Sequence, residues 1–222
     1  MKDDVAIIIP AYNPSKELYN LIEDLMKSQY TKIVIINDGS ENTKIFEELA
    51  EKVKIITHKS NKGKGIAIKT GIEYCYDSYK NIIGIITVDA DGQHRIEDIN
   101  KVYNKFYLEK NAIILGSRNF KAKNIPLKSK IGNKIFRYIL NLKTKVKIKD
   151  TQTGLRAIPF CHLEQLTDIK GERFEYETNV ILYAIKMNIK ISEVDIQSVY
   201  INKNKSTNYR AIRDSIKIML QL

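Results

Sequence analysis

The chain has 222 residues, 43% of them hydrophobic, and this length and composition predict one globular domain with a substantial core. Its formal net charge is +11, from 37 Lys and Arg against 26 Asp and Glu, and the excess indicates an anionic partner. There is no signal peptide, no apolar run near the roughly 18 residues of a membrane span, and no paired-cysteine motif. These absences argue against a disulfide-rich secreted scaffold. We expect a protein of the reducing cytosol in which Cys75 and Cys161 are small core residues.

The first half of the chain alternates apolar runs with amphipathic stretches. The apolar runs predict strands buried on both faces, at residues 5–10, 32–37, 53–57, 82–88 and 112–117. The stretches between them predict helices at residues 15–28, 43–51, 65–76 and 96–108. Asn13 is the expected N-cap of the first helix, with Pro14 in its first turn. This alternation predicts an α/β fold with a mostly parallel central sheet flanked by helices.

The second half is less regular. A helix is predicted at residues 127–142, with an apolar face opposite a basic one, and DTQTGLR at 150–156 predicts a polar loop. A helix at 174–187, one or two short strands within 189–200 and a short amphipathic helix at 210–222 follow. No repeat or low-complexity linker marks a domain boundary.

Acidic side chains follow two of the predicted strands. Asp89 and Asp91 come directly after the strand at 82–88, Asp38 follows an earlier strand, and Tyr12 ends the first one. Parallel strands end at one edge of a sheet, where open α/β sheets bind ligands. A base-stacking ring and carboxylates at that edge predict a site for a nucleoside diphosphate.

The DxD pair itself predicts a metal site. Two carboxylates this close repel each other unless a cation lies between them, and oxygen ligands suit Mg²⁺ or Mn²⁺, which also hold phosphates. Gln93 can add a neutral oxygen. The alternative, a solvated turn at Asp91-Gly92, is the commoner explanation of an isolated DxD, so the metal site depends on the rest of the chain.

The stretch NKGKG at 61–65 is the nearest feature to a phosphate-binding loop. No Walker A or GxGxxG sequence is present. Lys64, or the backbone N–H groups around it, can meet phosphate at the start of a helix. Alternatively, the two glycines only allow a tight entry into that helix.

Six motifs occur in an order that resembles a known family. They are PAYN at 10–13, NDGS at 37–40, DADGQH at 89–94, GSR at 116–118, DTQTGLRA at 150–157 and GERFEYETN at 171–179. Together they resemble a family 2 glycosyltransferase of the GT-A fold, and within it the dolichyl-phosphate mannosyltransferase and polyprenyl-phosphate glucosyltransferase group. The resemblance covers essentially the whole chain. It implies one catalytic domain, with residues 1–118 as the nucleotide-sugar half and 119–222 as the acceptor half.

The resemblance also implies roles for individual residues. Nucleotide contacts fall on Pro10, Ala11, Tyr12, Asp38 and Asp89, with Lys64 as the further candidate described above. The metal ligands are Asp89, Asp91 and Gln93. Phosphate and acceptor contacts fall on Arg118, Lys134, Gln152, Arg156, Lys205 and Ser206, and Asp150 joins Asp89, Asp91 and Arg118 as a catalytic candidate. Many relatives have Glu where this chain has Pro14, so one nucleotide contact lacks its usual residue.

The implied reaction is metal-dependent transfer of a hexose, with inversion, from a donor of the UDP-glucose or GDP-mannose type to a polyprenyl or dolichyl phosphate. A lipid phosphate is ionised near pH 7 and needs no general base. An acceptor hydroxyl, as in cell-surface polysaccharide synthesis, would need a carboxylate base, for which Glu172, Glu175 and Glu177 are candidates. A solvated helix start explains Glu172 and Glu177 better, whereas both roles suit Glu175 equally.

The positive charge is concentrated in one segment. Residues 118–149 hold eleven basic and no acidic residues, and the other 26 basic residues balance the 26 acidic ones. Beside the apolar face at 127–142, this block predicts attachment to an anionic membrane surface on its cytoplasmic side. Relatives often carry a membrane domain after the catalytic one, which implies a separate membrane-domain partner as one means of attachment.

Two rival functions use the same features. A basic nucleic-acid-binding protein could stack Phe136 and Tyr138 on bases. No RNP, KH or zinc motif is present, and the strand-end carboxylates repel phosphate without a metal, so we expect no nucleic acid partner. A nucleotidyltransferase can share the sheet and metal site, but it usually has a glycine-rich signature after the first strand, where this chain has PAYNP.

Overall fold

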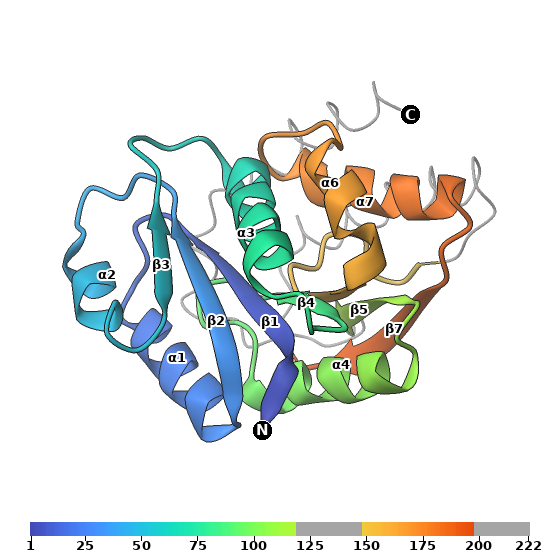
Figure 1. Ribbon diagram of the computed structural model, residues 1–222, viewed down its shortest axis with the longest axis horizontal. Coiled ribbons are helices and arrows are strands. Elements are labelled where there is room, and N and C mark those ends of the chain that lie inside the picture. Colours follow the sequence, from blue (N-terminus) through green and yellow to red (C-terminus); the bar gives the residue numbers. More distant parts are fainter. Residues whose placement is uncertain (119–147, 198–222) are drawn as a thin grey trace.

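The computed structural model describes residues 1–118 and 148–197, and these form a seven-stranded sheet with the strand order β3-β2-β1-β4-β6-β5-β7 (Figure 1). The strands are β1 Lys2–Ala11, β2 Tyr30–Asn37, β3 Lys54–Thr57, β4 Gly84–Thr87, β5 Ile113–Arg118, β6 Arg156–Pro159 and β7 Ile191–Ile196. Neighbouring strands are parallel except for β6, which is antiparallel to both β4 and β5. The predicted α/β fold with a mostly parallel sheet is confirmed.

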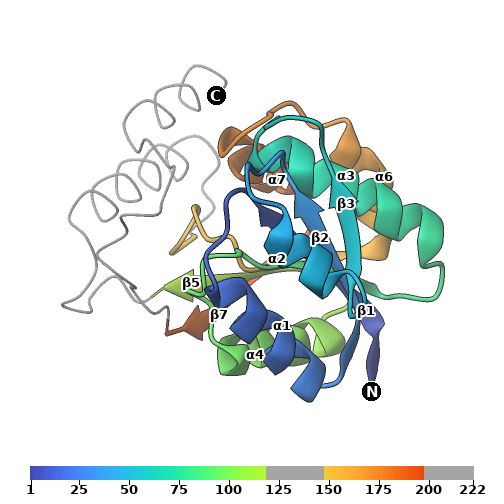
Figure 2. The same ribbon diagram turned by 90° about the vertical axis from the view of Figure 1, so that its left-hand side faces the viewer.

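Helices cover both faces of the sheet, as Figure 2 shows with α1 and α4 below it and α3, α6 and α7 above. One layer contains α1 Glu17–Lys27, α2 Lys44–Leu49 and α4 Ile96–Leu108. The other contains α3 Lys64–Ser78, the 3-10 turn η1 Phe160–His162, α6 Leu163–Thr167 and α7 Glu175–Lys186. None of the helices in the described part of the chain has the length and apolar character needed to cross a bilayer.

Burial on both faces explains why the strands are continuous apolar runs. In β1, Ile7 and Ile9 belong to the core under α1 and α4, whereas Ala6 and Ile8 belong to the core under α3 and α7. All four side chains are fully buried. Alternate residues of a strand point to opposite faces, so a strand with a core on each side requires apolar residues throughout.

The first helix begins later than predicted. It starts at Glu17, and Asn13 is not its N-cap but has a φ of 47°. The Asn13 N–H donates to the Ser40 hydroxyl, and the Asn13 side-chain oxygen accepts from the Glu41 N–H, each over 2.9 Å. Asn13 therefore joins the loop after β1 to the loop after β2.

The second half differs most from its prediction, because β6 was not expected. This four-residue strand follows the predicted polar loop directly and pairs between β4 and β5. The Thr87 hydroxyl at the end of β4 donates to the Gly154 carbonyl over 2.8 Å and ties that loop to the sheet. The described parts of the two predicted halves consequently share one sheet.

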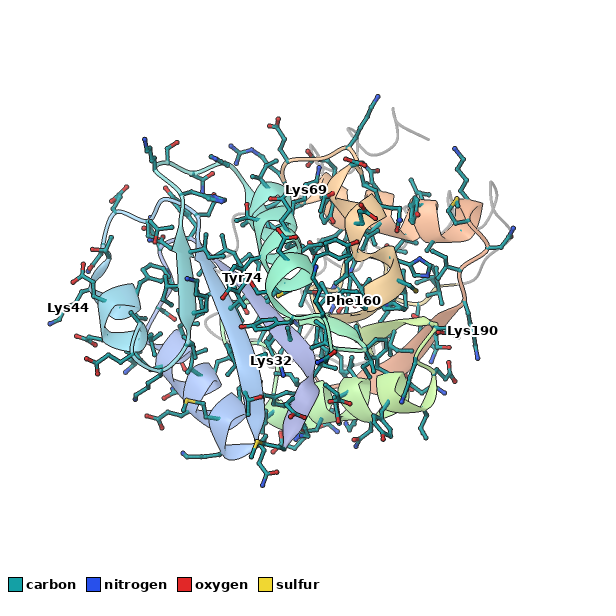
Figure 3. The ribbon with its side chains drawn as sticks, in the orientation of Figure 1. Lys32, Lys44, Lys69, Tyr74, Phe160 and Lys190 are labelled. Carbon is teal, nitrogen blue, oxygen red and sulfur yellow. The ribbon has the colours of Figure 1, made fainter. Side chains whose placement is uncertain are left out.

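Aromatic side chains of the α3 layer contact lysines and one another. The Lys54 ammonium lies 5.3 Å from the centroid of the Tyr74 ring. The ring of Tyr76 in α3 stacks on that of Phe160 in η1, with their centroids 5.4 Å apart. Figure 3 labels Tyr74 and Phe160. In the same layer Cys75 is buried as expected, but Cys161 is exposed, so the prediction that it is a core residue was wrong.

The predicted helices at 127–142 and 210–222 lie outside the described residues.

Candidate functional site

The strands β1, β2 and β4 end at one edge of the sheet, and the predicted nucleotide and metal residues follow them there. Ala11 pairs with Asn37 in the ladder between β1 and β2, and Ile8 pairs with Thr87 in the ladder between β1 and β4. Tyr12, Asp38 and Asp89 therefore leave neighbouring strands at similar heights. Tyr12 is 38% exposed, so its ring is accessible to a ligand, whereas Ala11 is buried and offers only its backbone. Pro10, before it, is half-buried.

Asp38 holds the loop that precedes α3. Its carboxylate accepts from the N–H groups of Lys62 and Gly63 at 2.9 and 2.8 Å, and it lies 2.8 Å from Nδ1 of His58. Asp38 is only 3% exposed. The nucleotide contact expected of it stays a prediction, and its observed role is to fix the entry to α3. His58 was not among the predicted site residues, and its other ring nitrogen lies 3.1 Å from the Thr70 hydroxyl.

Two glycines let α3 begin against the start of α7. Gly63 has a φ of 101°, and a Cβ there would lie 2.5 Å from the Glu172 carbonyl oxygen. At Gly65 a Cβ would lie 2.7 Å from the Cβ of Tyr176. The predicted tight helix entry is therefore present, and it places the intervening Lys64 at the acidic edge of the sheet.

Lys64 bridges two carboxylates from different elements. Its ammonium lies 2.7 Å from Oδ1 of Asp89 and 2.9 Å from Oε2 of Glu177. Burial alone would lower the pKa of Lys64, but the two carboxylates outweigh it and raise the pKa above its usual value. For Asp89, burial favours a raised pKa, but Lys64 and His94 together hold the pKa well below its usual range. Lys64 and Asp89 are therefore both charged at neutral pH.

The DxD turn is packed closely around Asp89. His94 is buried, and its Nε2 lies 3.4 Å from Oδ2 of Asp89. Gly154 also lies against this carboxylate. The N–H of Gln93 donates to Oδ1 of Asp91 over 3.1 Å, and burial followed by the charge of Asp89 raises the pKa of Asp91. The charge of a cation bound nearby would offset both effects, because it favours the ionised form of Asp91.

The donor set fits a divalent ion that is shared with a bound phosphate. Asp89 and Asp91 supply carboxylate oxygens of the kind that Mg²⁺ and Mn²⁺ prefer. Within residues 1–118 and 148–197, no three His, Cys, Asp or Glu side chains are grouped so that they could hold a metal ion. Mg²⁺ is commonly held by one or two carboxylates together with substrate phosphates and waters, so two carboxylates are sufficient.

Arg118 and Asp150 form a two-pronged ion pair. Nε and Nη2 of Arg118 lie 2.6 and 3.0 Å from the two oxygens of Asp150, and the Gln152 N–H donates to the same carboxylate over 3.1 Å. Asp150 is fully buried. Full burial does not fit the direct catalytic contact predicted for Asp150, which instead positions Arg118 and the loop at 150–156. The phosphate contact of Arg118 and the acceptor contact of Gln152 stay predictions.

Arg156 is an interior residue rather than a ligand contact. It is 2% exposed, and its guanidinium donates to the backbone carbonyls of Thr151, Thr153 and Glu177. The acceptor contact predicted for Arg156 does not fit this placement, because its three nitrogens are directed at the chain's own carbonyls. Arg156 connects the loop before β6 to α7.

Comparisons with known proteins identify the family. Residues 6–167 match the family model described as Glycosyl transferase family 2. The chain belongs to glycosyltransferase family 2. It is 36% identical over 217 residues to the UDP-N-acetylglucosamine–dolichyl-phosphate N-acetylglucosaminyltransferase of Methanococcus voltae, covering 88% of this chain and 86% of that one. It is 29% identical over 255 residues to the dolichyl-phosphate beta-glucosyltransferase of Dictyostelium discoideum, covering 96% and 73%.

Solved structures support the same fold. Glucosyl-3-phosphoglycerate synthase of Mycobacterium tuberculosis, in complex with Mn²⁺, uridine-diphosphate-glucose and phosphoglyceric acid, is similar with a TM-score of 0.76. The match covers 99% of this chain and 79% of that one, at 11% sequence identity. The predicted GT-A fold and the predicted glycosyltransferase activity are confirmed at the level of the family.

The two acidic residues in the first turn of α7 make different contacts in this glycosyltransferase. Oε1 of Glu175 accepts from the N–H groups of Glu172 and Arg173 at 3.1 and 3.3 Å, so Glu175 stabilises the start of its own helix. Of the two roles considered for Glu175, these contacts support the helix start, and the general-base role stays a prediction. Glu177 was expected at a solvated helix start, yet it is 6% exposed and binds Lys64. Its spacing from the buried residues Val180, Ile181 and Ala184 is the signal that could have identified it.

Three residues predicted to contact phosphate or the acceptor are not among those that the structure describes. Lys134, Lys205 and Ser206 lie outside the described residues, as does most of the basic segment. Their phosphate and acceptor contacts stay predictions.

Replacing Gly154 by Ala should displace the Asp89 carboxylate. A Cβ at Gly154 would lie 2.2 Å from Oδ2 of Asp89, and the Gly154 backbone is held by Thr87. We expect a folded protein that is destabilised by about 1–3 kcal/mol and binds nucleotide more weakly in Mn²⁺, measured by calorimetry. Gly116→Ala is the matched control, since the atoms nearest to a Cβ there are side-chain carbons of Leu155 and Ile196, at 3.1 and 3.2 Å. Equal nucleotide affinity of the two variants would contradict this prediction.

Proposed function

We propose that this glycosyltransferase transfers a hexose, with inversion, from a nucleotide sugar of the UDP-glucose or GDP-mannose type to a polyprenyl or dolichyl phosphate. The proposal includes Mg²⁺ or Mn²⁺ as cofactor. The observation that carries it is that the pair Asp89 and Asp91 and the exposed ring of Tyr12 lie at one edge of the sheet, where β1, β2 and β4 end. The names of the two dolichyl-phosphate relatives support the acceptor, and the Mn²⁺ and UDP-glucose in the similar solved structure support the donor and the metal.

The chain's own residues account for the main requirements of this reaction. Asp89 and Asp91 would hold the ion, which when bound supplies positive charge to the departing diphosphate. Tyr12 offers an aromatic face to the base. Lys64 stands beside Asp89 as a second positive group, and Arg118 follows at the end of β5. An oxygen of the acceptor phosphate then attacks the anomeric carbon from the side opposite the diphosphate.

The surroundings of the two glutamates favour a phosphate acceptor over a sugar hydroxyl. A hydroxyl needs a carboxylate to remove its proton, whereas a phosphate monoester is already ionised near pH 7. Glu175 is engaged with its own helix start, and Glu177 is engaged with Lys64. These contacts occupy one oxygen of each carboxylate, and they support the phosphate acceptor, which requires no base.

A thermal-shift screen tests the proposed donor and metal. A ligand at about 100 times its dissociation constant stabilises a protein by roughly 2.7 kcal/mol, which is about 5–10 °C for a domain of this size. We expect either UDP and its sugars or GDP and GDP-mannose to reach such a shift in Mn²⁺, and a smaller shift in EDTA. Equal shifts with and without Mn²⁺, or none with any of these nucleotides, would contradict the proposal.

The same screen identifies the donor for an acceptor test. That donor should be consumed with a polyprenyl phosphate as acceptor but not with the corresponding polyprenol. Transfer to a free sugar in place of the lipid phosphate would support the alternative function in polysaccharide synthesis.

The second part of the proposal is that the enzyme works on an anionic membrane at its cytoplasmic face. It is supported by the eleven basic residues of 118–149 and by the relatives named for lipid-linked acceptors. Each Lys or Arg near such a surface contributes about 1 kcal/mol, screened by salt. Cosedimentation should therefore require anionic lipid and weaken as salt is raised. Equal binding to neutral and anionic vesicles would count against it.

A further inference from the structure

Lys64 occupies the position of a counter-cation for Asp89. Its ammonium lies 2.7 Å from Oδ1 of the carboxylate that is proposed to hold the metal. A divalent ion bound by that oxygen would meet a positive charge already in place. The backbone around Lys64 is held in place, because the Ile66 N–H donates to the Glu172 carbonyl over 3.1 Å. Gly63 also lies against Glu172, just before α7, and Gly65 lies against Tyr176 of α7. The Lys64 ammonium can therefore move away from Asp89 by rotation of its side chain, without a movement of the backbone.

Glu177 is placed to keep Lys64 when Asp89 releases it. Its Oε2 lies 2.9 Å from the ammonium, and its side chain is 8% exposed. Its other oxygen, Oε1, is buried and has no hydrogen-bond partner within the described part of the chain. A buried carboxylate oxygen without a donor is unfavourable, so its presence requires an explanation. The Lys64 ammonium, which has three N–H donors, could satisfy both oxygens of Glu177 once it leaves Asp89.

We infer that Lys64 is an exchangeable counter-cation that couples binding of the metal to binding of the diphosphate, with Glu177 as the residue that positions it. Without ligands, Lys64 neutralises Asp89. When the ion and the diphosphate bind, Asp89 turns to the ion, and Lys64 stays on Glu177 and meets a phosphate oxygen. This inference rests on the proposed metal-dependent function and adds a mechanism for ordering the site.

The exchange makes the two ligands cooperative. The metal alone has to break the Lys64–Asp89 pair without replacing it, and the diphosphate alone has to do the same. When both bind, the pair is broken once and Lys64 gains a phosphate partner. Each ligand therefore raises the affinity of the protein for the other by more than their direct contact does. By linkage, the metal raises the affinity for the diphosphate by the same factor as the diphosphate raises the affinity for the metal.

The test measures Mn²⁺ binding directly, by the electron paramagnetic resonance signal of free Mn²⁺, with and without UDP and with GDP as the second probe. In the wild-type protein we expect weak binding of Mn²⁺ alone and at least tenfold tighter binding with one of the two nucleotides. Lys64→Met should bind Mn²⁺ alone about tenfold tighter, and the nucleotide should then add only a few-fold. Glu177→Gln should change the affinity for Mn²⁺ alone in the opposite direction, because Lys64 is left with Asp89 as its main partner.

Lys69→Met is the matched control, because Lys69 lies on the same helix with its ammonium 5.3 Å from the Tyr176 ring (Figure 3). It should reproduce the wild-type affinities. Should Lys64→Met fail to fold, Lys64→Arg, which keeps the charge and should keep most of the coupling, and Glu177→Gln carry the comparison. Unchanged Mn²⁺ affinity and coupling in folded Lys64→Met would overturn the inference and leave the proposed function standing. A wild-type protein that binds no Mn²⁺ with either nucleotide would overturn both.

Discussion

Asp89→Asn should lower the rate of sugar transfer by about three orders of magnitude while leaving the protein folded. The amide has the size of the carboxylate but cannot carry the charge that holds a divalent ion beside Asp91. Charge stabilisation by a metal is worth several kcal/mol in the transition state, and about 4 kcal/mol corresponds to a factor of a thousand. The same substitution also removes the negative partner of Lys64, whose ammonium is 2.7 Å away.

The measurement is single-turnover consumption of the donor identified by the thermal-shift screen, in saturating Mn²⁺ and with a polyprenyl phosphate. Asp77→Asn provides the matched control, since Asp77 is exposed near the far end of α3 and should leave the rate unchanged. Circular dichroism melts of both variants separate loss of activity from loss of fold. A folded Asp89→Asn protein with a rate within tenfold of wild type would remove Asp89 from the metal site.

Local sequence patterns predicted the elements that are buried in a regular way. The predicted helix at 96–108 matches α4 at both ends, because its apolar residues recur at helical spacing along one face. The strands β1, β2 and β4 were found because a core lies on each side of them, which leaves a continuous apolar run in the sequence. The strand-end position of Asp89 and Tyr12 followed from the parallel topology and needed no further information.

Tertiary contacts determined what the sequence could not predict. Strand β6 has four residues and owes its place to pairing with β4 and β5, which lie far away in the sequence. The choice between Glu175 and Glu177 depended on where α3 meets α7, because only that contact brings Lys64 to one of them.

The motif DTQTGLRA at 150–157 shows the limit of reading polar residues as site residues. Four of its polar residues are buried: Asp150, Thr151, Thr153 and Arg156. Arg156, for example, donates to the backbone carbonyls of Thr151 and Thr153. Polar residues in such a loop satisfy buried backbone groups, which is as strong a requirement as contact with a ligand. The loop thereby positions two residues of the candidate site, because Asp150 pairs with Arg118 and Gly154 lies against Asp89.

Arg156→Met should produce the largest loss of stability among single changes in this region. The guanidinium donates to three backbone carbonyls, those of Thr151, Thr153 and Glu177, which methionine would leave without these donors. A buried acceptor without a partner is unfavourable by about 1–3 kcal/mol. We therefore expect a loss of at least about 3 kcal/mol, or about 6–12 °C in Tm for a domain of this size.

One effect opposes this loss, because removing a buried charge relieves its desolvation. Burial lowers the pKa of Arg156, because the interior solvates the charged guanidinium less well than water does. The carboxylates of Glu177, Asp150 and Asp89 act in the opposite direction and favour the charge, and they would lose that neighbour in the variant. The carbonyls and the carboxylates both remain when the guanidinium is gone, so the destabilising effects win.

Urea unfolding followed by circular dichroism measures the change in the free energy of unfolding. Arg95→Met is the matched control, since Arg95 is exposed before α4 and the same substitution there should change stability by no more than about 0.5 kcal/mol. Because Arg156 joins the loop beside Asp89 to α7, the variant should also weaken nucleotide binding under conditions where it is still folded. An Arg156→Met protein as stable as Arg95→Met would show that the loop and α7 are held together by packing alone, and it would reopen a direct ligand role for Arg156.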